Sequence, residues 1–259
     1  GLNTPGKQQE VRDPILSNNL ACLGLVETKV KCENPLSVLR NVIPSWIFCV
    51  NFSSFPSGRI MVLWNLCLLF VKPQFESPQL IECIVRAIKV DVFCRISFVY
   101  GSNSVAERRI LWGDISSWSL LCGCDPGIFL GDFNAVRFPE DRSRGCLDWN
   151  ASMEDCNTSI LNVNLEDIRC SGLRFSWRKG NSGVFRKLDR DLVNTFWLDS
   201  FPSSIADFLP FGISDHSPII IKAGVVQFGK LPFKFFNHWD DYEGFHALVS
   251  SAWSDNTSG

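Results

Sequence analysis

The segment Ile128-Phe129-Leu130-Gly131-Asp132-Phe133-Asn134 is a short apolar run that ends in a carboxylate and an amide two residues apart. Side chains alternate between the two faces of a β-strand, so Asp132 and Asn134 share one face if the strand extends that far. We interpret the run as a buried strand that delivers both polar groups to one rim of a sheet. An Asx-turn that leaves the strand is the competing interpretation of the same residues.

A second polar cluster, Ser214-Asp215-His216-Ser217-Pro218, stands immediately before the apolar run Ile219-Ile220-Ile221. A third apolar run, Leu20 to Val26, ends in Glu27. Considered alone, Glu27 is better explained as the first solvated residue after a strand. Strands that each carry acid, amide or imidazole groups at one end nevertheless predict a single polar site at one rim of a sheet.

The remaining sequence alternates short apolar runs with a few amphipathic segments. Turn residues such as Ser57-Gly58 and Lys72-Pro73 separate the runs between 46 and 100, and this predicts an antiparallel meander of strands at Trp46–Phe52, Arg59–Leu69, Gln79–Val85 and Val92–Tyr100. We expect helices at 104–120, around Met153 to Leu161 and at Asn194–Phe201, and a short or late-starting helix in 7–19, where Pro14 interrupts the pattern. Further strands are expected at 173–177, 185–193, 206–209 and 219–221. Many strands with few helices predict an α+β or layered α/β/α fold in which helices cover the sheets.

Composition limits the possible classes of protein. The 259 residues are 46% hydrophobic and 20% charged, which is typical of a globular chain with one large domain or two small ones. The net charge of −2 provides no overall basic field, so nucleic-acid binding would require a local basic face. The apolar run Ile60 to Val71 is too short for a membrane span, which needs about 20 residues. We therefore expect no membrane partner.

Eleven cysteines are spaced irregularly and stand mostly in apolar runs, where the thiol behaves as a small hydrophobic group. This pattern predicts a reducing compartment, and with no signal peptide it predicts a nuclear or cytoplasmic location. The chain opens on Gly1-Leu2-Asn3-Thr4 without an initiator methionine, so we expect a segment cut from a longer chain.

The polar residues at the predicted strand ends have the donor chemistry of a metal-assisted hydrolase. Mg²⁺ takes oxygen ligands, usually one or two carboxylates with water and substrate phosphate. Glu27 suits a direct metal ligand, and Asp132 with Asn134 suits a base or a positioner for the attacking water. His216 suits a contact with a phosphoryl oxygen, and Asp215 suits the metal or hydrogen-bond shell. Such a set fits in-line hydrolysis of a phosphodiester, in which cations stabilise the growing negative charge.

Each of these residues also has an ordinary structural explanation. Asp189 stands among basic residues and suits a surface ion pair of little energetic weight. His216 suits a turn, and Tyr100 suits either a core aromatic or the strand-end phenol of a site. A Ser-His-Asp hydrolase is less well supported because the chain has no G-x-S-x-G elbow, and zinc because His238 and His246 stand in the tail. The conjunction of several compatible strand ends favours the metal-assisted hydrolase.

The order of these segments resembles the endonuclease/exonuclease/phosphatase superfamily, the fold of pancreatic deoxyribonuclease and of apurinic endonucleases. The matching segments are Val26-Glu27-Thr28-Lys29, Phe98-Val99-Tyr100-Gly101, Leu130-Gly131-Asp132-Phe133-Asn134, Lys187-Leu188-Asp189-Arg190 and Ile213-Ser214-Asp215-His216-Ser217-Pro218. A closer resemblance is to the endonuclease domain of plant LINE-type (non-LTR) retrotransposons. It extends from residue 1 to about residue 253, through Gly1-Leu2-Asn3, Glu107-Arg108-Arg109, Asn134-Ala135-Val136-Arg137, Phe175-Ser176-Trp177 and Pro232-Phe233-Lys234-Phe235-Phe236-Asn237.

The resemblance implies a DNase I-like α+β fold, a four-layer α/β sandwich with two mostly antiparallel sheets flanked by helices. It implies an Mg²⁺-dependent endonuclease, with Mn²⁺ as a substitute, that nicks target DNA and hands a 3′-hydroxyl to a reverse transcriptase. The roles it implies for the matching residues are as follows: Glu27 and Asp215 as metal ligands, Tyr100 as the phenol near the scissile phosphate, Asp132 as the residue that orients or deprotonates the water, Asn134 as its phosphate-binding partner, Asp189 as a supporting acid and His216 as the phosphate contact.

Two departures from the family pattern shape our expectations. The family's first strand carries an Asn of the metal site, and this chain begins after it, so we expect that strand to be missing and the activity to be impaired. We expect an endonuclease-like domain over residues 1–223, then a linker and partial helix over 224–259 that lead toward an absent reverse transcriptase domain. The alternatives are an inactive retroelement remnant acting at most as a binding module, and a phosphomonoesterase of the same fold.

Overall fold

The computed structural model describes residues 2, 4–30, 35–53, 58–145, 148–180, 182–224 and 250, and the linker and partial helix expected over 224–259 therefore fall almost entirely outside the described residues. The helices are α1 (Pro5–Ser17), α2 (Pro35–Val42), α3 (Val105–Cys122), α4 (Ala151–Asn162) and α5 (Thr195–Ser200), with a 3-10 turn η1 at Pro139–Asp141. The strands are β1 (Cys22–Val26), β2 (Ile47–Val50), β3 (Ile60–Trp64), β4 (Leu69–Ser77), β5 (Leu80–Ala87), β6 (Phe93–Tyr100), β7 (Gly127–Asp132), β8 (Glu166–Asp167), β9 (Cys170–Gly172), β10 (Trp177–Arg178), β11 (Phe185–Arg186), β12 (Asp189–Val193), β13 (Ile205–Phe208) and β14 (Ile219–Lys222).

The strands form one large sheet and three smaller ones. The six-stranded sheet has the order β4-β5-β6-β7-β12-β8, and two three-stranded sheets have the orders β1-β3-β2 and β14-β13-β9. Strands β10 and β11 form a separate hairpin. All pairings are antiparallel except β6 with β7 and β9 with β13, so the sheets are mostly antiparallel, as predicted.

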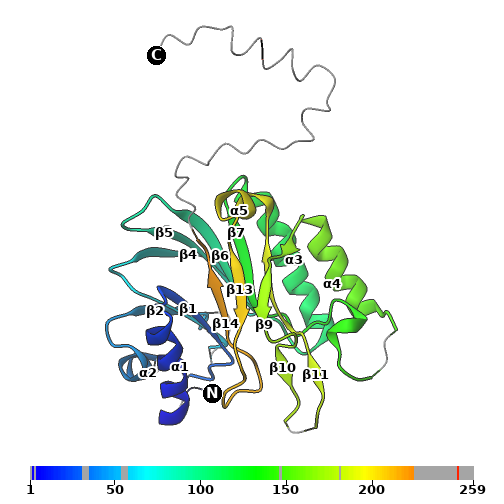
Figure 1. Ribbon diagram of the computed structural model, residues 1–259, viewed down its shortest axis with the longest axis horizontal. Helices are drawn as coiled ribbons and strands as arrows, with labels where there is room; N and C mark the ends of the chain where they lie inside the picture. Colours follow the sequence, from blue (N-terminus) through cyan, green and yellow to red (C-terminus); the bar gives the residue numbers. More distant parts are fainter. Residues whose placement is uncertain are drawn as a thin grey trace. The chain divides into compact units, whose positions relative to one another are not determined.

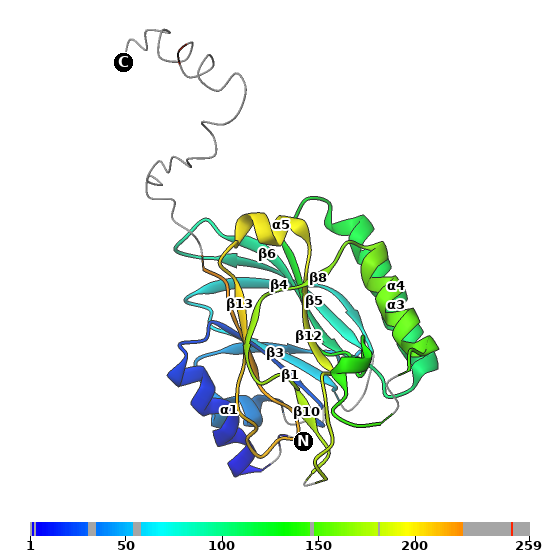
Figure 2. The same ribbon diagram turned by 45° about the vertical axis from the view of Figure 1, so that its right-hand side comes forward.

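Three hydrophobic clusters show how the layers stack. One cluster lies between the large sheet and the small sheets and contains Val62 of β3, Phe98 of β6 and Phe208 of β13. A second joins α3 and α4 to the other face of the large sheet, and a third joins α1 and α2 to the β1-β3-β2 sheet. The predicted α+β sandwich is therefore confirmed, with α3 and α4 covering one outer face and α1 and α2 the other (Figures 1 and 2).

Strand β7, the predicted organising strand, lies inside the large sheet between β6 and β12. Its last residue, Asp132, pairs with Tyr100 at the end of β6 and with Asp189 at the start of β12. The preceding residue, Gly131, has a φ of 133°. A Cβ at Gly131 would approach the Val99 carbonyl oxygen to 2.2 Å, so only glycine allows these strands to lie this close.

The antiparallel meander expected between residues 46 and 100 is wrong in two respects. The chain changes sheets after β3, which ends at Trp64 and not at Leu69, so β2 and β3 pair in one sheet and β4, β5 and β6 in another. Lys72-Pro73 is not a turn but part of β4, with a register shift between Pro73 and Phe75. Proline lacks the amide proton that a central strand needs, but β4 is an edge strand and tolerates it.

Two other expectations also need correction. Residues 173–176 are not a strand, because the β-structure there consists of β9 just before them and β10 just after them. Helix α1 is longer than expected and contains Pro14, which stands near its C-terminal end, where the lost hydrogen bond affects only the last turns. The segment that forms α2 carried no prediction, although Leu39, Val42 and Ile43 have helical spacing and are buried in the described structure.

In the described part of the chain, none of the helices has the length and apolar character needed to cross a bilayer. The cysteines that the structure describes are all free thiols, and several of them, including Cys83 and Cys94, lie in the cluster between the sheets.

Candidate active site

Three polar side chains converge where β7 ends and β12 begins. Asp132 and Asp189 face each other across this strand pair, and His216 stands just before β14. The His216 Nδ1 atom lies 2.9 Å from Asp189 Oδ2, and Nε2 lies 3.9 Å from Asp132 Oδ2. Both carboxylates are buried, with 2% of Asp132 and 5% of Asp189 exposed. The two acids therefore hold the imidazole between them.

The close packing of these groups changes their acidity. Burial, and then the neighbouring charge of Asp189, raises the pKa of Asp132 to about 7, against the opposing effect of His216. Burial alone would lower the pKa of His216, but its hydrogen bond with Asp189 and the charges of both acids raise it to about 9. At neutral pH His216 is therefore an imidazolium held by Asp189, and Asp132 is poised to accept or release a proton.

Asn134 fixes the carboxylate of Asp132 instead of extending the strand. Its backbone N donates to Asp132 Oδ1 and its side-chain Nδ2 donates to Asp132 Oδ2, both at 2.8 Å, and its φ of 48° lies in the left-handed region. Nδ2 also donates to the Gly101 carbonyl oxygen at 2.9 Å. The Asx-turn and the site are thus the same feature, because Asn134 is held by Gly101 and in turn orients both oxygens of Asp132.

Tyr100 and Glu27 form a second pair beside this group. The Tyr100 hydroxyl donates to Glu27 Oε1 at 2.5 Å, which links the end of β6 to the residue after β1. Burial, followed by the hydrogen bond with Glu27, raises the pKa of Tyr100, so its hydroxyl stays a protonated donor. Tyr100 is also the β-sheet neighbour of Asp132, so the two pairs share one rim.

Asp215 has a different environment from His216. Its exposed carboxylate accepts from Trp177 Nε1 at 3.1 Å, and its carbonyl oxygen accepts from the Arg178 amide at 2.9 Å. Asp215 therefore holds the β10–β11 hairpin beside His216, and its charge helps to raise the pKa of the imidazole.

Among the described residues, three side chains lie close enough together to bind one metal ion. They are Asp132, Asp189 and His216, whose donor atoms lie within 4.8 Å of one another. This group includes neither Glu27 nor Asp215. A protonated imidazole cannot coordinate a cation, and Mg²⁺ prefers oxygen donors, so the carboxylates are the donors that fit this ion. Glu27 is also exposed at the rim. The oxygen donors present suit a hard divalent cation.

Ser176 is a positioning residue that the sequence did not single out for the site. Its fully buried Oγ accepts from the amides of Leu188 and Asp189 at 3.0 and 2.9 Å, and its carbonyl oxygen accepts from the Ser217 amide at 2.7 Å. It therefore fixes the start of β12 and the residue after His216. The sequence signal was a lone serine between two aromatic residues, which is too common to predict this role.

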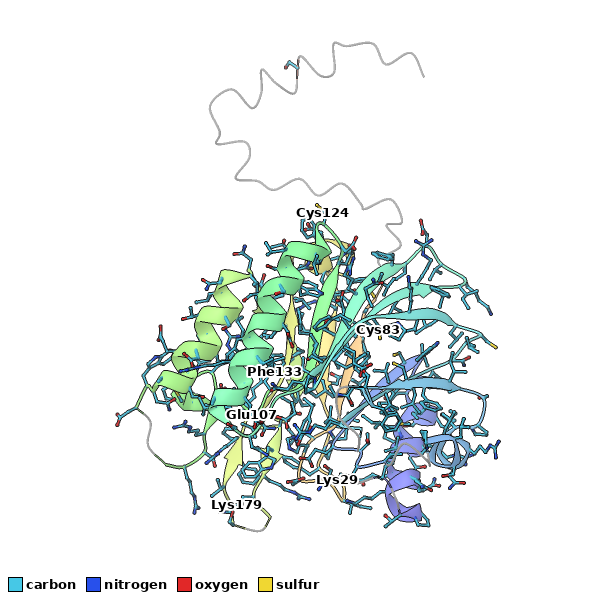
Figure 3. The ribbon with its side chains drawn as sticks, turned by 180° about the vertical axis from the view of Figure 1, so that it is seen from behind. Lys29, Cys83, Glu107, Cys124, Phe133 and Lys179 are labelled. Atoms are coloured by element: carbon cyan, nitrogen blue, oxygen red, sulfur yellow. The ribbon has the colours of Figure 1, made fainter. Side chains whose placement is uncertain are left out.

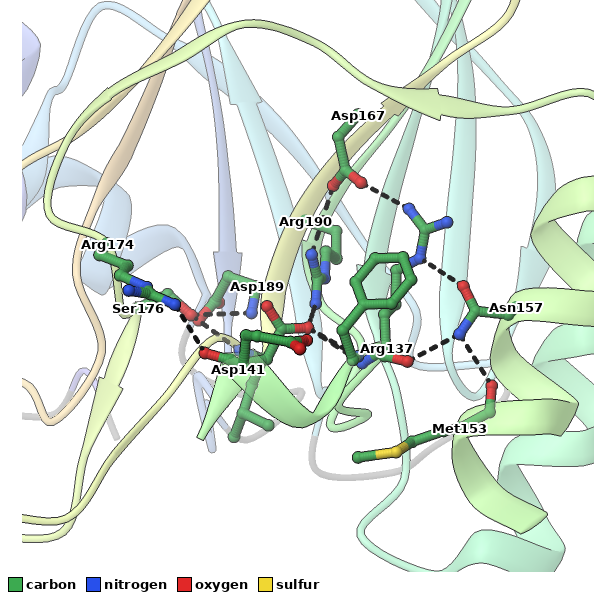
Figure 4. Close-up of polar contacts among 12 residues, drawn as sticks. Arg137, Asp141, Met153, Asn157, Asp167, Arg174, Ser176, Asp189 and Arg190 are labelled. Carbon is green, nitrogen blue, oxygen red and sulfur yellow. Dashed lines mark hydrogen bonds and ion pairs between the residues drawn. The ribbon is translucent and has the colours of Figure 1, made fainter. Parts of the chain in front are cut away.

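Behind Asp189, a buried ionic network ties β12 to its surroundings (Figure 4). Arg190, which is 2% exposed, pairs with Asp141 of η1 and with Asp167 of β8. Arg137 Nη1 lies 2.5 Å from Asp167 Oδ2, and Arg137 Nε donates to Asn157 of α4 at 3.0 Å. The network holds the segment after Asn134 and the strand that carries Asp189 in a fixed relation.

Arginines and aromatic rings alternate on and beside the β10–β11 hairpin. The guanidinium carbon of Arg178 lies 4.8 Å from the Phe211 ring centroid, and that of Arg186 lies 5.6 Å from the centroid of Trp177. An isolated bridge pairs Trp177 with His216, so this basic and aromatic surface directly adjoins the candidate site.

No protein-family model and no curated protein sequence matches the chain. Solved structures do match it. The endonuclease domain of TRAS1, a telomere-specific non-LTR retrotransposon, has a TM-score of 0.66 at 12% identity, over 85% of this chain and 93% of that one. An endonuclease/exonuclease/phosphatase family protein from Bacteroides thetaiotaomicron has a TM-score of 0.60 at 10% identity, over 83% and 88%. Beta toxin from Staphylococcus aureus, solved with bound magnesium ions, has a TM-score of 0.57 at 12% identity, over 84% and 92%.

The chain therefore has the DNase I-like α+β fold of endonuclease/exonuclease/phosphatase proteins. At these identities the likeness concerns the fold, and the chemistry must be argued from the residues of the site.

Proposed function

We propose that this chain is an Mg²⁺-dependent endonuclease-type domain that hydrolyses DNA phosphodiester bonds. The observation that carries the proposal is the Asp132–His216–Asp189 group, which lies beside the Tyr100–Glu27 pair at one rim. A base near neutral pKa, an imidazolium and a phenol within one site are the groups that in-line attack on a phosphodiester needs.

Asp132 acts as the base and His216 as the cationic donor. A carboxylate with a pKa of about 7 can orient a water molecule and accept its proton at neutral pH. The Asn134 hydrogen bonds hold both oxygens of Asp132, so its direction is set before substrate binds. His216 donates from Nε2 toward a non-bridging phosphoryl oxygen, while Asp189 keeps the ring charged and oriented.

Glu27 is the proposed metal ligand, and Asp215 is the second carboxylate that we assign to the oxygen donors of the cation. When bound there, the cation neutralises charge on the phosphoryl group and on the leaving oxygen. The Tyr100 hydroxyl holds Glu27 in place and lies next to the position proposed for the scissile phosphate.

The β10–β11 hairpin favours DNA over a small phosphomonoester. Arginine guanidinium groups bind phosphates, and aromatic rings stack on bases, so a surface that alternates arginines with half-buried aromatic residues suits a nucleic-acid strand. The similar TRAS1 domain is an endonuclease from a non-LTR retrotransposon. We extend the proposal to a LINE-type element, of the plant branch that the sequence resembles, whose nicked target primes an attached reverse transcriptase.

Nicking of supercoiled plasmid tests the proposal. We expect Mg²⁺-dependent nicking that EDTA abolishes, and a decrease of about 10² to 10⁴-fold in Asp132→Asn and His216→Ala, the usual contribution of acid–base groups. Asp207→Asn, which removes a half-buried carboxylate paired with Lys222, serves as the matched control. Nicking that is unchanged in both site variants would refute the assigned site. DNA binding without nicking by the unmodified chain would favour the binding-module alternative.

A further inference from the structure

A cavity of about 530 Å³ lies beside the candidate site and shares two of its residues, Glu27 and Tyr100. Its remaining lining residues are Lys29, Gly58, Arg59, Ser102, Asn103 and Ser104. Neither Lys29 nor Arg59 contributes to the Asp132–His216–Asp189 group. The lining therefore combines two cations and three small polar residues that the proposed hydrolysis does not use.

The wall of the cavity that carries Lys29 is held in a strained and fixed conformation. Glu27 and Lys29 both have left-handed φ values, 52° and 50°, which cost free energy in residues other than glycine. Between them, Thr28 is buried, and its Oγ1 donates to the Gly58 carbonyl oxygen at 2.8 Å. This bond ties the segment of Lys29 to the segment of Arg59, so both cations line one cavity.

Arg59 also adjoins the candidate site directly. Its guanidinium carbon lies 6.0 Å from the Tyr100 ring centroid, within the range of a cation–π contact. Tyr100 thus separates the cavity from Asp132, with the ring under Arg59 and the hydroxyl on Glu27.

The opposite wall is built from the residues that precede α3. Ser102 Oγ donates to Glu107 at 2.5 Å, and its amide donates to Gln79 Oε1 at 2.6 Å, so this wall is fixed as well. Ser104 caps α3, and Glu107 in the first turn partly offsets the positive potential of this helix end, so the two cations are the main anion-binding groups of the cavity. Figure 3 shows Lys29 at the same lower rim of the domain as Lys179 of the β10–β11 hairpin.

We propose that this cavity is a second anion subsite, which binds a phosphate of the substrate strand next to the scissile one. The proposal rests on the proposed function and deepens it: the substrate must carry at least two phosphates, as a nucleic-acid strand does. Lys29 and Arg59 bind this second phosphate, and Tyr100 lies between the two phosphate positions. A strand would then run along the rim from the hairpin to Lys29.

Two substrates distinguish an effect on the second phosphate subsite from an effect on the hydrolytic site. Bis(4-nitrophenyl) phosphate has one phosphoryl group and engages only the hydrolytic site, whereas a twelve-nucleotide DNA engages both. We expect Arg59→Gln and Lys29→Gln to lower kcat/KM for the DNA at least tenfold, through KM, with less than a threefold loss on the single-phosphate ester. Arg59→Lys should recover part of the loss, and Arg86→Gln, at an exposed position on β5, is the control of equal charge. Equal losses on both substrates, or none, would overturn the subsite.

Binding of the labelled DNA in EDTA tests the cavity without catalysis. Anisotropy titrations should show at least fivefold weaker binding for both variants than for Arg86→Gln, while thermal melting shows that all three fold. Undiminished binding would overturn the subsite whether or not the chain cleaves DNA. Binding that weakens as expected in a chain that cleaves neither substrate would refute the proposed function and keep the subsite.

Discussion

His216 contacts two carboxylates through different ring nitrogens, and this arrangement gives the acids unequal roles. Asp189 is at hydrogen-bond distance from Nδ1, while Asp132 faces Nε2 at 3.9 Å. The shorter contact fixes the ring and its charge, and the longer one leaves space near Nε2 and Asp132 for reacting groups. In the proposed hydrolysis, Asp189 therefore acts through His216, whereas Asp132 acts on the water.

Asp189→Asn should lower the pKa of His216 from about 9 toward its ordinary value near 6.5. The substitution removes the nearest charge that raises this pKa, while burial still lowers it and the charges of Asp132 and Asp215 still raise it. An NMR pH titration of the His216 ring measures the change, with Asp207→Asn as a control at a carboxylate paired with Lys222. At neutral pH, the activity of Asp189→Asn should also be lower than that of the original chain, because a smaller fraction of His216 is imidazolium. An unchanged His216 titration would show that Asp189 does not hold the charge on the ring.

Asp191 lies on the same strand as Asp189 but has no comparable partner. It is fully buried, and neither carboxylate oxygen has a hydrogen bond among the described residues. Burial, and then the charge of Asp167, raises its pKa to about 7. The folded protein thus binds a proton that the unfolded chain, with an ordinary carboxyl pKa of 3.8, releases. Stability should therefore fall as pH rises from about 4 to about 7.

Asp191→Leu should raise the free energy of unfolding at pH 7 by about 1–3 kcal/mol, because it removes a buried group without partners. It should also flatten the decrease in stability between pH 4 and 7. Urea denaturation at several pH values measures both effects. A variant that is less stable than the original chain at pH 7 would show that the Asp191 carboxylate has a stabilising partner.

At the scale of single elements, Ser176 connects three segments that reach the site separately. Ser176→Ala leaves the buried amides of Leu188 and Asp189 without an acceptor, which should cost about 1–3 kcal/mol of stability. It should also reduce nicking at least tenfold under conditions where the variant is folded, because Asp189 loses an anchor and with it the fixed position from which it orients the His216 ring. Ser182→Ala, at an exposed hairpin position where Oγ donates to the Lys179 carbonyl, is the matched control. Full activity in a destabilised Ser176→Ala would limit this serine to a structural role.

Elements with long periodic patterns were predictable from the sequence. Strands β6 and β7 and helices α3 and α4 lie close to their expected positions, because each has an apolar face long enough to give a clear period. The six-residue helix α5 also lies where it was expected. Strands β8 to β11 have two or three residues each, and no period exists over that length. Their positions depend on partners such as β12 and β13, which local sequence does not identify.

Within the site, the sequence indicated which residues belong to it but not which of them contact one another. Asp132, Asn134 and His216 were recognisable because polar groups interrupt apolar runs, and the structure brings Asp132 and His216 together. Their contact depends on topology: β12 runs antiparallel to β7, so its first residue meets the last residue of β7. The pairing of Asp189 with His216 and of Tyr100 with Glu27 joins residues 27 and 73 positions apart, beyond any local pattern.

At the scale of the whole chain, charge must act locally. A net charge of −2 gives no general attraction to DNA, so the proposed DNA binding requires a local basic surface such as the β10–β11 hairpin. Each arginine that neutralises one phosphate steepens the dependence of log K on log salt by about 0.9. The number of phosphate contacts is therefore measurable from the salt dependence of binding.

Replacing Arg178 and Arg186 together by Gln should weaken DNA binding and reduce the magnitude of the salt slope by roughly 1.8, the contribution of two phosphate contacts. Lys72→Gln with Arg86→Gln is the matched control, because it removes equal charge from exposed positions on β4 and β5, at the other side of the large sheet from β12. Anisotropy titrations of labelled duplex DNA between about 50 and 200 mM salt measure both slopes. If both double variants reduced the slope equally, the effect would follow net charge alone, and the hairpin would have no special contact with DNA. A change confined to the hairpin variant would place the duplex beside His216, where the proposed hydrolysis requires it.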